Sequence, residues 1–299
     1  MLINIDAGHG SNTAGKRTPP MPRDIDIDGD GKVDIKKGEQ YREHYANVGV
    51  AVLLVEELKR CGFKTMQTGF NDANAYDDQD QPLDERQKEI AKAKCDYSIS
   101  IHFNAYGDGV AFNSAEGVEI NIHETHPKES KKLAETVLKH LVKGTPQTNR
   151  GVKARSLAIV NCEKLKVKGA ILVELAFMTN LREATEMMAN REYWKESAKE
   201  ICMGICEYTG VKYIPELNYP AKSITPKSPS ADIKWAQERL NRVIPNWLPK
   251  LEVDGVYGPK TRIAVLIYWD QLGWGRHMED DGKTIGLATR QALAEEKKK

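Results

Sequence analysis

Two histidines directly follow apolar segments in which strands are expected. His9 lies between two glycines after LINID, and His102 follows YSISI in SISIHFNA. The carboxyl ends of strands in an open α/β sheet meet at the edge where ligands bind. Two imidazoles at that edge are one ligand short of a zinc site with an open position, and a carboxylate commonly completes such a set. The spacing therefore predicts a shared metal site.

Three glutamates are candidates for the acidic part of this site. Glu43, in GEQYREHYANVGV, falls in the first turn of a predicted helix, and Glu39 is a competing ligand four residues earlier in the loop. Glu174 lies inside the apolar segment AILVELAFMTN. A buried carboxylate without a partner is unfavourable, so Glu174 is expected either to be paired or to have a raised pKa, as a general base requires. Taken alone, each residue fits an ordinary structural role, and only their combination indicates chemistry.

Apolar segments typical of strands alternate with helical patterns along the first two thirds of the chain, and these elements must position the candidate residues. The pattern predicts an α/β fold, a mostly parallel twisted sheet flanked by helices. The expected strands cover residues 2–6, 63–67, 97–101, 118–122, 157–160 and 170–175. The expected helices cover residues 46–62, 82–95, 128–143 and 190–210.

A change in composition predicts a second domain. The segment YIPELNYPAKSITPKSPS is rich in proline and serine, so we expect a catalytic domain over 1–212, a linker over 213–230 and a small three-helix domain over 231–299. Pro259 is expected at the first position of a helix. Trp269 and Trp274 are interpreted as core residues rather than sugar platforms.

Several ordered motifs resemble a known family, the zinc-dependent N-acetylmuramoyl-L-alanine amidases of the amidase-3 type. The resemblance covers about residues 2–209 and includes IDAGHG, the helix with Asn47 and Val48, and LDERQKEIAKAKCDYSISIHFNA. RGVKARSLAIV and AILVELAFMTN are similar to the two closing motifs. The segment 231–293 resembles the peptidoglycan-binding-domain-1 type, through WAQERLN and VDGVYGPKTRIAVLIYW.

The resemblance implies a role for each matching residue. It implies that His9, Glu43 and His102 hold Zn²⁺ and that Glu174 is the catalytic residue. Zinc would polarise the amide carbonyl and acidify water, and Glu174 would pass the proton to the leaving amine. Asn104 is expected either to contact the substrate or to stabilise a turn.

An acidic loop departs from the family pattern. DIDIDGDGKVD, residues 24–34, matches the opening of a calcium loop. The expected Ca²⁺ ligands are Asp26, Asp28, Asp30 and Asp34. Position twelve of the loop is Lys37, where a bidentate acid is usual, and a frame that starts at Asp24 places Ile35 there. The alternative interpretation is a solvated acidic loop without an ion.

Composition excludes some function classes. Lys and Arg number 44 against 43 Asp and Glu, so the net charge of +1 favours neither nucleic acid nor a membrane as a partner. Five cysteines without a CxxC pair indicate neither a disulfide framework nor a thiolate zinc site, and Cys202 and Cys206 are interpreted as core residues. A cysteine peptidase that uses Cys95 and His102 is disfavoured, because the two residues are seven positions apart along one strand, too far for a hydrogen bond between them.

The resemblance to the amidase-3 type implies an enzyme that hydrolyses the amide between N-acetylmuramic acid and L-alanine in bacterial peptidoglycan. The alternative is a non-catalytic wall-binding protein with a degenerate amidase-like domain. The sequence has no signal-peptide pattern, so we expect a phage or prophage endolysin made in the host cytoplasm that acts on the wall after release. Arg86 is interpreted as a helix-surface salt bridge rather than a substrate clamp.

Overall fold

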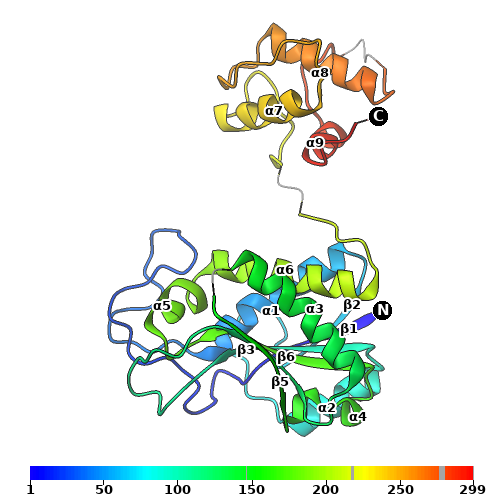
Figure 1. The fold of residues 1–299 in the computed structure, drawn as a ribbon. Coiled ribbons are helices and arrows are strands. Elements are labelled where there is room, and N and C mark those ends of the chain that lie inside the picture. The colour runs from blue at the N-terminus through cyan, green and yellow to red at the C-terminus, as the bar shows by residue number, and fades with distance from the viewer. Residues whose placement is uncertain (146, 217–218, 276–279, 299) are drawn as a thin grey trace. The chain divides into compact units, whose positions relative to one another are not determined.

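The computed structural model describes residues 1–145, 147–216, 219–275 and 280–298. The chain divides into two compact units, Met1–Ile214 and Pro215–Lys299 (Figure 1). Each unit has its own buried apolar cluster. The boundary between the units lies two residues beyond the predicted end of the first domain at residue 212.

A six-stranded sheet forms the centre of the first unit. Its strands are β1 (Leu2–Ala7), β2 (Lys64–Thr68), β3 (Tyr97–Asn104), β4 (Val118–His123), β5 (Asn149–Arg155) and β6 (Gly169–Phe177). Their order is β2-β1-β3-β6-β4-β5, and every neighbouring pair is parallel except β4 with β6. The structure therefore confirms the predicted α/β class with a mostly parallel sheet.

Helices cover both faces of the sheet. The four long helices are α1 (Glu43–Arg60), α2 (Leu83–Ala93), α3 (Lys128–Gly144) and α6 (Arg191–Thr209). The short ones are α4 (Cys162–Leu165), α5 (Leu181–Glu183), the 3-10 turn Ala158–Val160 and the π-helical turn Ala184–Met188. Figure 1 shows α1, α3 and α6 on one face, and α2 with α4 on the other. Among the described residues, no helix is both long and apolar enough to cross a membrane.

The alternation of side chains along β3 gives the two faces of the sheet different characters. Ile99 and Ile101 are fully buried in the main core, which also contains residues of α1, α3 and α6. Ser98 and Ser100 are on the opposite face, because successive residues of a strand point to opposite sides. His102 shares that second face, where the strand reaches its carboxyl end. The polar face of the sheet therefore leads directly to the predicted metal ligands.

The predicted strand over residues 157–160 is wrong. The strand in this region is β5, Asn149–Arg155, and Ala158–Val160 forms a 3-10 turn instead. β5 is the outer strand and pairs only with β4, so its charged side chains can remain at the surface. The apolar residues that follow pack with α2 and α4 in a small separate core, and for this reason they need not join the sheet.

The second unit contains three helices among its described residues, α7 (Ser230–Val243), α8 (Pro259–Gln271) and α9 (Leu287–Ala294). Pro259 begins α8, as predicted. Trp269 is buried in the core of this unit, also as predicted. The expectation that Trp274 is a core residue is wrong, because its exposed fraction is 36%.

The predicted linker over 213–230 is packed at both of its ends. Tyr213 packs against the core of the first unit, and its hydroxyl donates a hydrogen bond to Glu57 at 2.9 Å. Ile224 is fully buried in the core of the second unit. Residues 217–218 lie outside the described residues. Among the described residues, the predicted linker therefore contributes one side chain to the core of each unit.

Candidate metal centre

The turn after β1 presents His9 in a strained conformation. His9 has a φ of 64°, which is uncommon for a residue with a side chain and is often found at functional sites. A Cβ atom on Gly8 would lie 2.1 Å from the ring of His102. A Cβ atom on Gly10 would lie 2.2 Å from the backbone nitrogen of Asp80. The glycines are therefore required on both sides of His9 because other groups approach the backbone closely.

The structure brings His9, Glu43 and His102 together from three distant parts of the chain. Glu43 is the first residue of α1, and His102 lies near the end of β3. Nε2 of His9 is 3.2 Å from Oε2 of Glu43, and Nδ1 of His102 is 3.0 Å from Oε1. The three possible ligand atoms all lie within 4.8 Å of one another. They can therefore share one coordination sphere.

The chemistry of this cluster fits a zinc ion. Two imidazoles and a carboxylate are the donor set of many catalytic zinc sites. Oε2 of Glu43 is buried and, apart from the contact with Nε2 of His9 at 3.2 Å, has no hydrogen-bond partner within the described residues, so a cation would satisfy it. Burial raises the pKa of Glu43, but its contacts with His102 and His9 outweigh that effect and hold the pKa well below its usual value. The carboxylate is therefore ionised, as a metal ligand must be.

Glu39, the competing ligand, lies outside this cluster. It is in the loop before α1, and its carboxylate accepts a hydrogen bond from the backbone nitrogen of Lys36 at 2.9 Å. Glu43 is therefore the carboxylate that the fold directs to the two histidines.

Two residues hold the turn of His9 in place: His44, which the sequence interpretation left out, and Asn47, which it named only as part of a family motif. Nδ1 of His44 lies 2.9 Å from the carbonyl oxygen of Gly8, and Asn47 donates to the same oxygen at 3.0 Å. Nε2 of His44 lies 3.2 Å from Asp78, so the ring bridges two loops. The position of His44 beside Glu43 on the first turn of a helix is the only sequence signal for this role.

The interpretation of Arg86 as a surface salt bridge is wrong. Its side chain is 1% exposed and forms an ion pair with the buried Asp6 at 3.0 Å. It also donates hydrogen bonds to the carbonyl oxygens of Ala7 at 2.8 Å and His9 at 2.7 Å. Arg86 therefore fixes the end of β1 and the backbone of His9 from beneath the site.

Glu174 lies on the strand next to His102. The two are directly paired in the register of β3 and β6, and Glu119 of β4 pairs with Glu174 from the other side. Oε2 of Glu174 is buried and has no hydrogen-bond partner in the part of the chain that the structure describes. Burial, followed by the charges of Glu43 and Glu119, raises its pKa well above the usual value. A carboxyl group in this state holds a proton more tightly than an ordinary one, as a base that must later return the proton requires.

Asn104 is the last residue of β3 and is half-buried. Its side-chain oxygen accepts a hydrogen bond from the backbone nitrogen of Ala105 at 2.8 Å, so it does stabilise the turn there. A contact between Asn104 and the substrate stays a prediction.

The acidic loop brings together only part of the predicted calcium set. Oxygen atoms of Asp26, Asp28 and Asp34 lie within 4.8 Å of one another, and all three residues are exposed. Asp30 instead forms an ion pair with Lys32 at 2.6 Å. Calcium binding at this loop stays a prediction.

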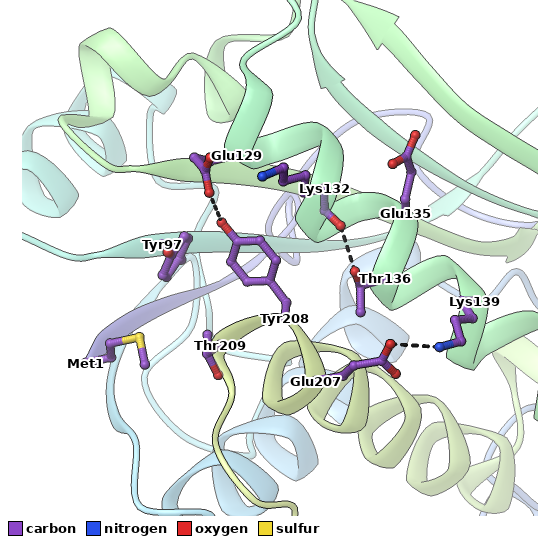
Figure 2. A pocket seen from close by; sticks show the side chains of 10 residues that line it. All are labelled: Met1, Tyr97, Glu129, Lys132, Glu135, Thr136, Lys139, Glu207, Tyr208 and Thr209. Carbon is purple, nitrogen blue, oxygen red and sulfur yellow. Dashed lines mark hydrogen bonds and ion pairs between the residues drawn. The ribbon is translucent and has the colours of Figure 1, made fainter.

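One further pocket and three cysteines lie away from the metal cluster. A pocket of about 660 Å³ is lined by Met1, Tyr97 and residues of α3 and α6, at the amino ends of the strands and thus at the opposite edge of the sheet (Figure 2). Cys95 precedes β3 at that same edge, so it cannot reach His102. Cys202 and Cys206 are buried in the core, as predicted.

Comparison with known proteins gives a family match and a shared fold. The family model described as Amidase_3, N-acetylmuramoyl-L-alanine amidase, matches residues 3–207. The N-acetylmuramoyl-L-alanine amidase from Clostridium difficile 630 is 23% identical, with 70% of this chain and 96% of that chain covered and a TM-score of 0.54. No curated protein sequence matches the chain.

Two further solved structures are similar. The catalytic domain of CwlV from Bacillus (Paenibacillus) polymyxa var. colistinus is 22% identical, covers 71% of this chain and 99% of that one, and gives a TM-score of 0.52. Ami1 from Mycobacterium smegmatis is 21% identical. The match covers 70% of this chain and 97% of that one, with a TM-score of 0.52. At these identities the likeness shows the fold alone.

Proposed function

The chain belongs to the N-acetylmuramoyl-L-alanine amidase family, and from this we propose that it hydrolyses the amide between N-acetylmuramic acid and L-alanine in peptidoglycan with the help of a zinc ion. The observation that carries the proposal is the convergence of His9, Glu43 and His102 at the edge of the sheet beside Glu174. Each of these residues lies within the matched segment, residues 3–207.

His9, Glu43 and His102 would hold the zinc ion. When bound, the metal supplies Lewis-acid polarisation of the scissile carbonyl and makes water acidic enough to act as a nucleophile at neutral pH. Glu174 takes the proton from the attacking water and delivers it to the nitrogen of the leaving L-alanine. Its position, one strand from His102, supports this role because the carboxyl group must reach both the water and the amide nitrogen.

The environment of Glu174 supports its assignment as the base. An ordinary carboxylate with a pKa near 4.3 would hold a proton too weakly to return it to an amine leaving group at neutral pH. Burial and the neighbouring carboxylates Glu43 and Glu119 raise the pKa of Glu174, so the proton is held more tightly.

The proposal extends to the second unit and to the origin of the protein. The resemblance of residues 231–293 to a wall-binding module supports a role in anchoring the enzyme to its insoluble substrate. The unit has its own apolar core, which is consistent with a separate binding function. We also keep as a proposal, on sequence alone, that the chain is a phage or prophage endolysin that reaches the wall from the cytoplasm.

Digestion of purified walls tests the activity. We expect new L-alanine amino termini without new reducing sugar ends, about one zinc ion per chain by metal analysis, loss of activity with a chelator and recovery with Zn²⁺. Alkylation of thiols should leave the activity unchanged. A wall-binding protein without turnover would instead bind the walls and release nothing, and this outcome would replace the proposed activity by the non-catalytic alternative.

A further inference from the structure

Three cysteines meet where the end of α1 packs against α6. Cys61 directly follows α1, and Cys202 and Cys206 lie one turn apart on α6. Their sulfur atoms all lie within 4.8 Å of one another, and Sγ of Cys202 is 3.8 Å from Sγ of Cys61. Glu43 begins the 18-residue helix that Cys61 follows, so the cluster lies about 27 Å from this proposed zinc ligand. The three thiols therefore form a separate site that the proposed function does not use.

The surroundings of these thiols are apolar. All three belong to the main core of the first unit, and their exposed fractions are 5% for Cys61, 0% for Cys202 and 2% for Cys206. Three thiolates carry three negative charges, so a monovalent or divalent cation bound to them would leave a net negative charge in the core, which is unfavourable. A disulfide is neutral and needs only two sulfur atoms. The environment therefore favours a covalent bond between two thiols over a metal site.

A surface segment covers Cys61. The backbone nitrogen of Ile214 donates a hydrogen bond to Sγ of Cys61 at 3.3 Å, and Ile214 itself is 45% exposed. Cys61 therefore lies directly beneath the surface, whereas Cys202 is fully buried. An N–H donor stabilises the thiolate, which is the form of cysteine that attacks an oxidant. Cys61 is therefore the thiol suited to react first, and Cys202 is in place to react with it.

We propose that Cys61 and Cys202 form a reversible disulfide when the chain meets a peroxide. The inference goes beyond the proposed function and does not depend on it, because none of the proposed zinc ligands takes part. The two cysteines are 141 positions apart, so the bond would join the end of α1 to the middle of α6. A link between such distant positions restricts the unfolded chain and thereby stabilises the folded one. The first unit would thus become more stable under oxidising conditions.

The reaction has two balanced steps. The thiolate of Cys61 attacks one oxygen of hydrogen peroxide, so that an S–O bond forms and the O–O bond breaks. The hydroxide that leaves takes up the proton that Cys61 had released and becomes water. The sulfur of Cys202 then attacks the sulfur of Cys61, the S–S bond forms, the S–O bond breaks, and the thiol proton leaves with the hydroxide as a second water. Two thiols lose two electrons in total, and a dithiol reductant reverses the result by exchange.

Peroxide treatment of the full chain tests the proposal. Hydrogen peroxide in slight excess should remove two of the five free thiols, and trypsin should then release residues 61–64 linked to residues 200–212. The linked chain should unfold at a temperature at least about 5 °C higher than the reduced chain. Dithiothreitol should restore both the thiols and the original unfolding temperature. This reversal separates the disulfide from methionine oxidation, which requires dedicated reductases for its repair.

Two alanine variants on α6 identify the partner of Cys61. Cys202→Ala should abolish both the linked peptide and the rise in unfolding temperature. Cys206→Ala is a matched control, because it removes the same group one turn away on the same helix, and it should keep both effects. Fragmentation of the linked peptide from the wild-type chain assigns the partner independently. The assignment therefore does not depend on the folding of either variant.

The outcomes are separable from those of the proposed function. A bond between Cys61 and Cys202 in the wild-type chain that also forms in Cys206→Ala supports the inference. Absence of a linked peptide from the wild-type chain, or a bond from Cys61 to Cys206 instead, would overturn it. An unchanged unfolding temperature of the linked chain would overturn the stabilising effect. Release of amino termini from walls is measured separately, so none of these results decides whether the chain is an amidase.

Discussion

Glu174 shares the carboxyl edge of the sheet with two buried carboxylates, Glu43 and Glu119. The three differ in what surrounds them: Glu43 contacts two histidines, Glu119 is bound by two arginines, and Oε2 of Glu174 has no hydrogen-bond partner in the described part of the chain. A carboxylate without partners beside two others keeps its proton more readily. At the scale of single residues, this difference in environment separates the proposed ligand from the proposed base.

Replacement of Glu174 by glutamine should remove turnover without changing the binding of zinc. The amide is close in shape to the carboxyl group but cannot accept the proton, so we expect kcat to fall by about 10² to 10⁴-fold. Zinc content should be unchanged because Glu174 is not one of the three proposed ligands. Activity assays and metal analysis of the same preparation measure both effects. Glu129→Gln, in the pocket at the opposite edge of the sheet (Figure 2), is the control and should keep its activity.

The pH dependence of the activity of the wild-type chain gives a second test of Glu174 as the base. A base works in its ionised form, and the pKa of Glu174 is raised above its ordinary value of 4.5. The activity should therefore fall, as the pH is lowered, through an apparent pKa above 4.5. A profile of kcat/KM that stays flat down to pH 4.5 would contradict the assignment of Glu174 as the base.

Gly8→Ala should weaken the metal site without changing any ligand. The added Cβ would lie 2.1 Å from the ring of His102, so the ring or the turn must shift. Displacement of groups that support a metal ligand typically lowers metal affinity by about 10 to 100-fold. A competition assay with a zinc indicator measures the change. Gly258→Ala is the control, because nothing lies within 4 Å of its added Cβ. Equal zinc affinity in the two variants would mean that Gly8 is not needed for the geometry of the site.

At the scale of elements, the sequence predicted those helices and strands that have a clear local pattern of apolar and polar residues. The helix α1 could be predicted from its pattern over residues 46–62, but it begins three residues earlier, at Glu43. This start places Glu43 in the helix and leaves Glu39 in the loop. The role of Arg86 could not be predicted, since its partners Ala7 and His9 are 79 and 77 residues away. The strand β5 was missed because an outer strand can carry charged residues, whereas the apolar run after it looked more like a strand.

The packing of α6 buries Glu200, and the ionisation of this residue makes the stability of the first unit depend on pH. Its side chain is 4% exposed and accepts a hydrogen bond from Thr145 just beyond α3. Burial, and then the charge of Glu196, raises the pKa of Glu200 from 4.5 to about 7. Because the folded chain binds this proton more tightly than the unfolded chain, the stability falls as the pH rises from about 4.5 to about 7 and stays lower above that range.

Glu200→Gln should remove this loss of stability. The glutamine cannot ionise, so we expect the free energy of unfolding of the first unit to rise by roughly 1–3 kcal/mol at pH 8 and to change little at pH 4.5. Urea unfolding at both pH values measures the difference. Glu196→Gln is a useful comparison because Glu196 is 44% exposed, and its effect should be smaller. A variant that is less stable than the wild-type chain at pH 8 would show that Glu200 makes a favourable interaction as a carboxylate.

The acidic loop over residues 24–34 should bind calcium through three of its five aspartates. Mutual repulsion among Asp26, Asp28 and Asp34 would be relieved by a divalent cation, and oxygen ligands suit Ca²⁺. Calorimetric titration should give a dissociation constant below about 1 mM. Asp28→Asn should weaken binding more than Asp30→Asn, because Asp30 pairs with Lys32 instead. Absence of binding below millimolar concentrations would leave the loop as a solvated acidic segment.

At the scale of the whole molecule, the alternation of strands and helices was enough to predict the fold class, but not the path of the chain. The antiparallel insertion of β4 between β6 and β5 depends on pairings between distant segments. That insertion matters for the site, because it places Glu119 directly beside Glu174. The sequence could therefore indicate the proposed zinc ligands through their motifs, whereas the carboxylate next to Glu174 became visible only in the folded sheet.

The division into two units predicts that catalysis and wall binding can be separated by truncation. Tyr213 and Ile214 belong with the first unit, since Ile214 donates from its backbone nitrogen to Cys61 at 3.3 Å and Arg60 donates to its carbonyl oxygen at 2.8 Å. A chain of residues 1–216 should therefore fold. It should cleave a soluble muramoyl peptide within about twofold of the wild-type rate, because that substrate needs no anchoring.

On insoluble walls the same truncated chain should be at least about tenfold slower, since an anchoring module raises the local concentration of the enzyme at its substrate. A shorter chain that ends at Thr209 removes the contacts of Tyr213 and Ile214, so it should unfold at a lower temperature than the chain of residues 1–216. Release of amino termini from walls and thermal unfolding measure the two effects. Equal rates on walls for the full and the 1–216 chains would exclude wall anchoring by the second unit, because the catalytic unit alone would then account for all of the activity.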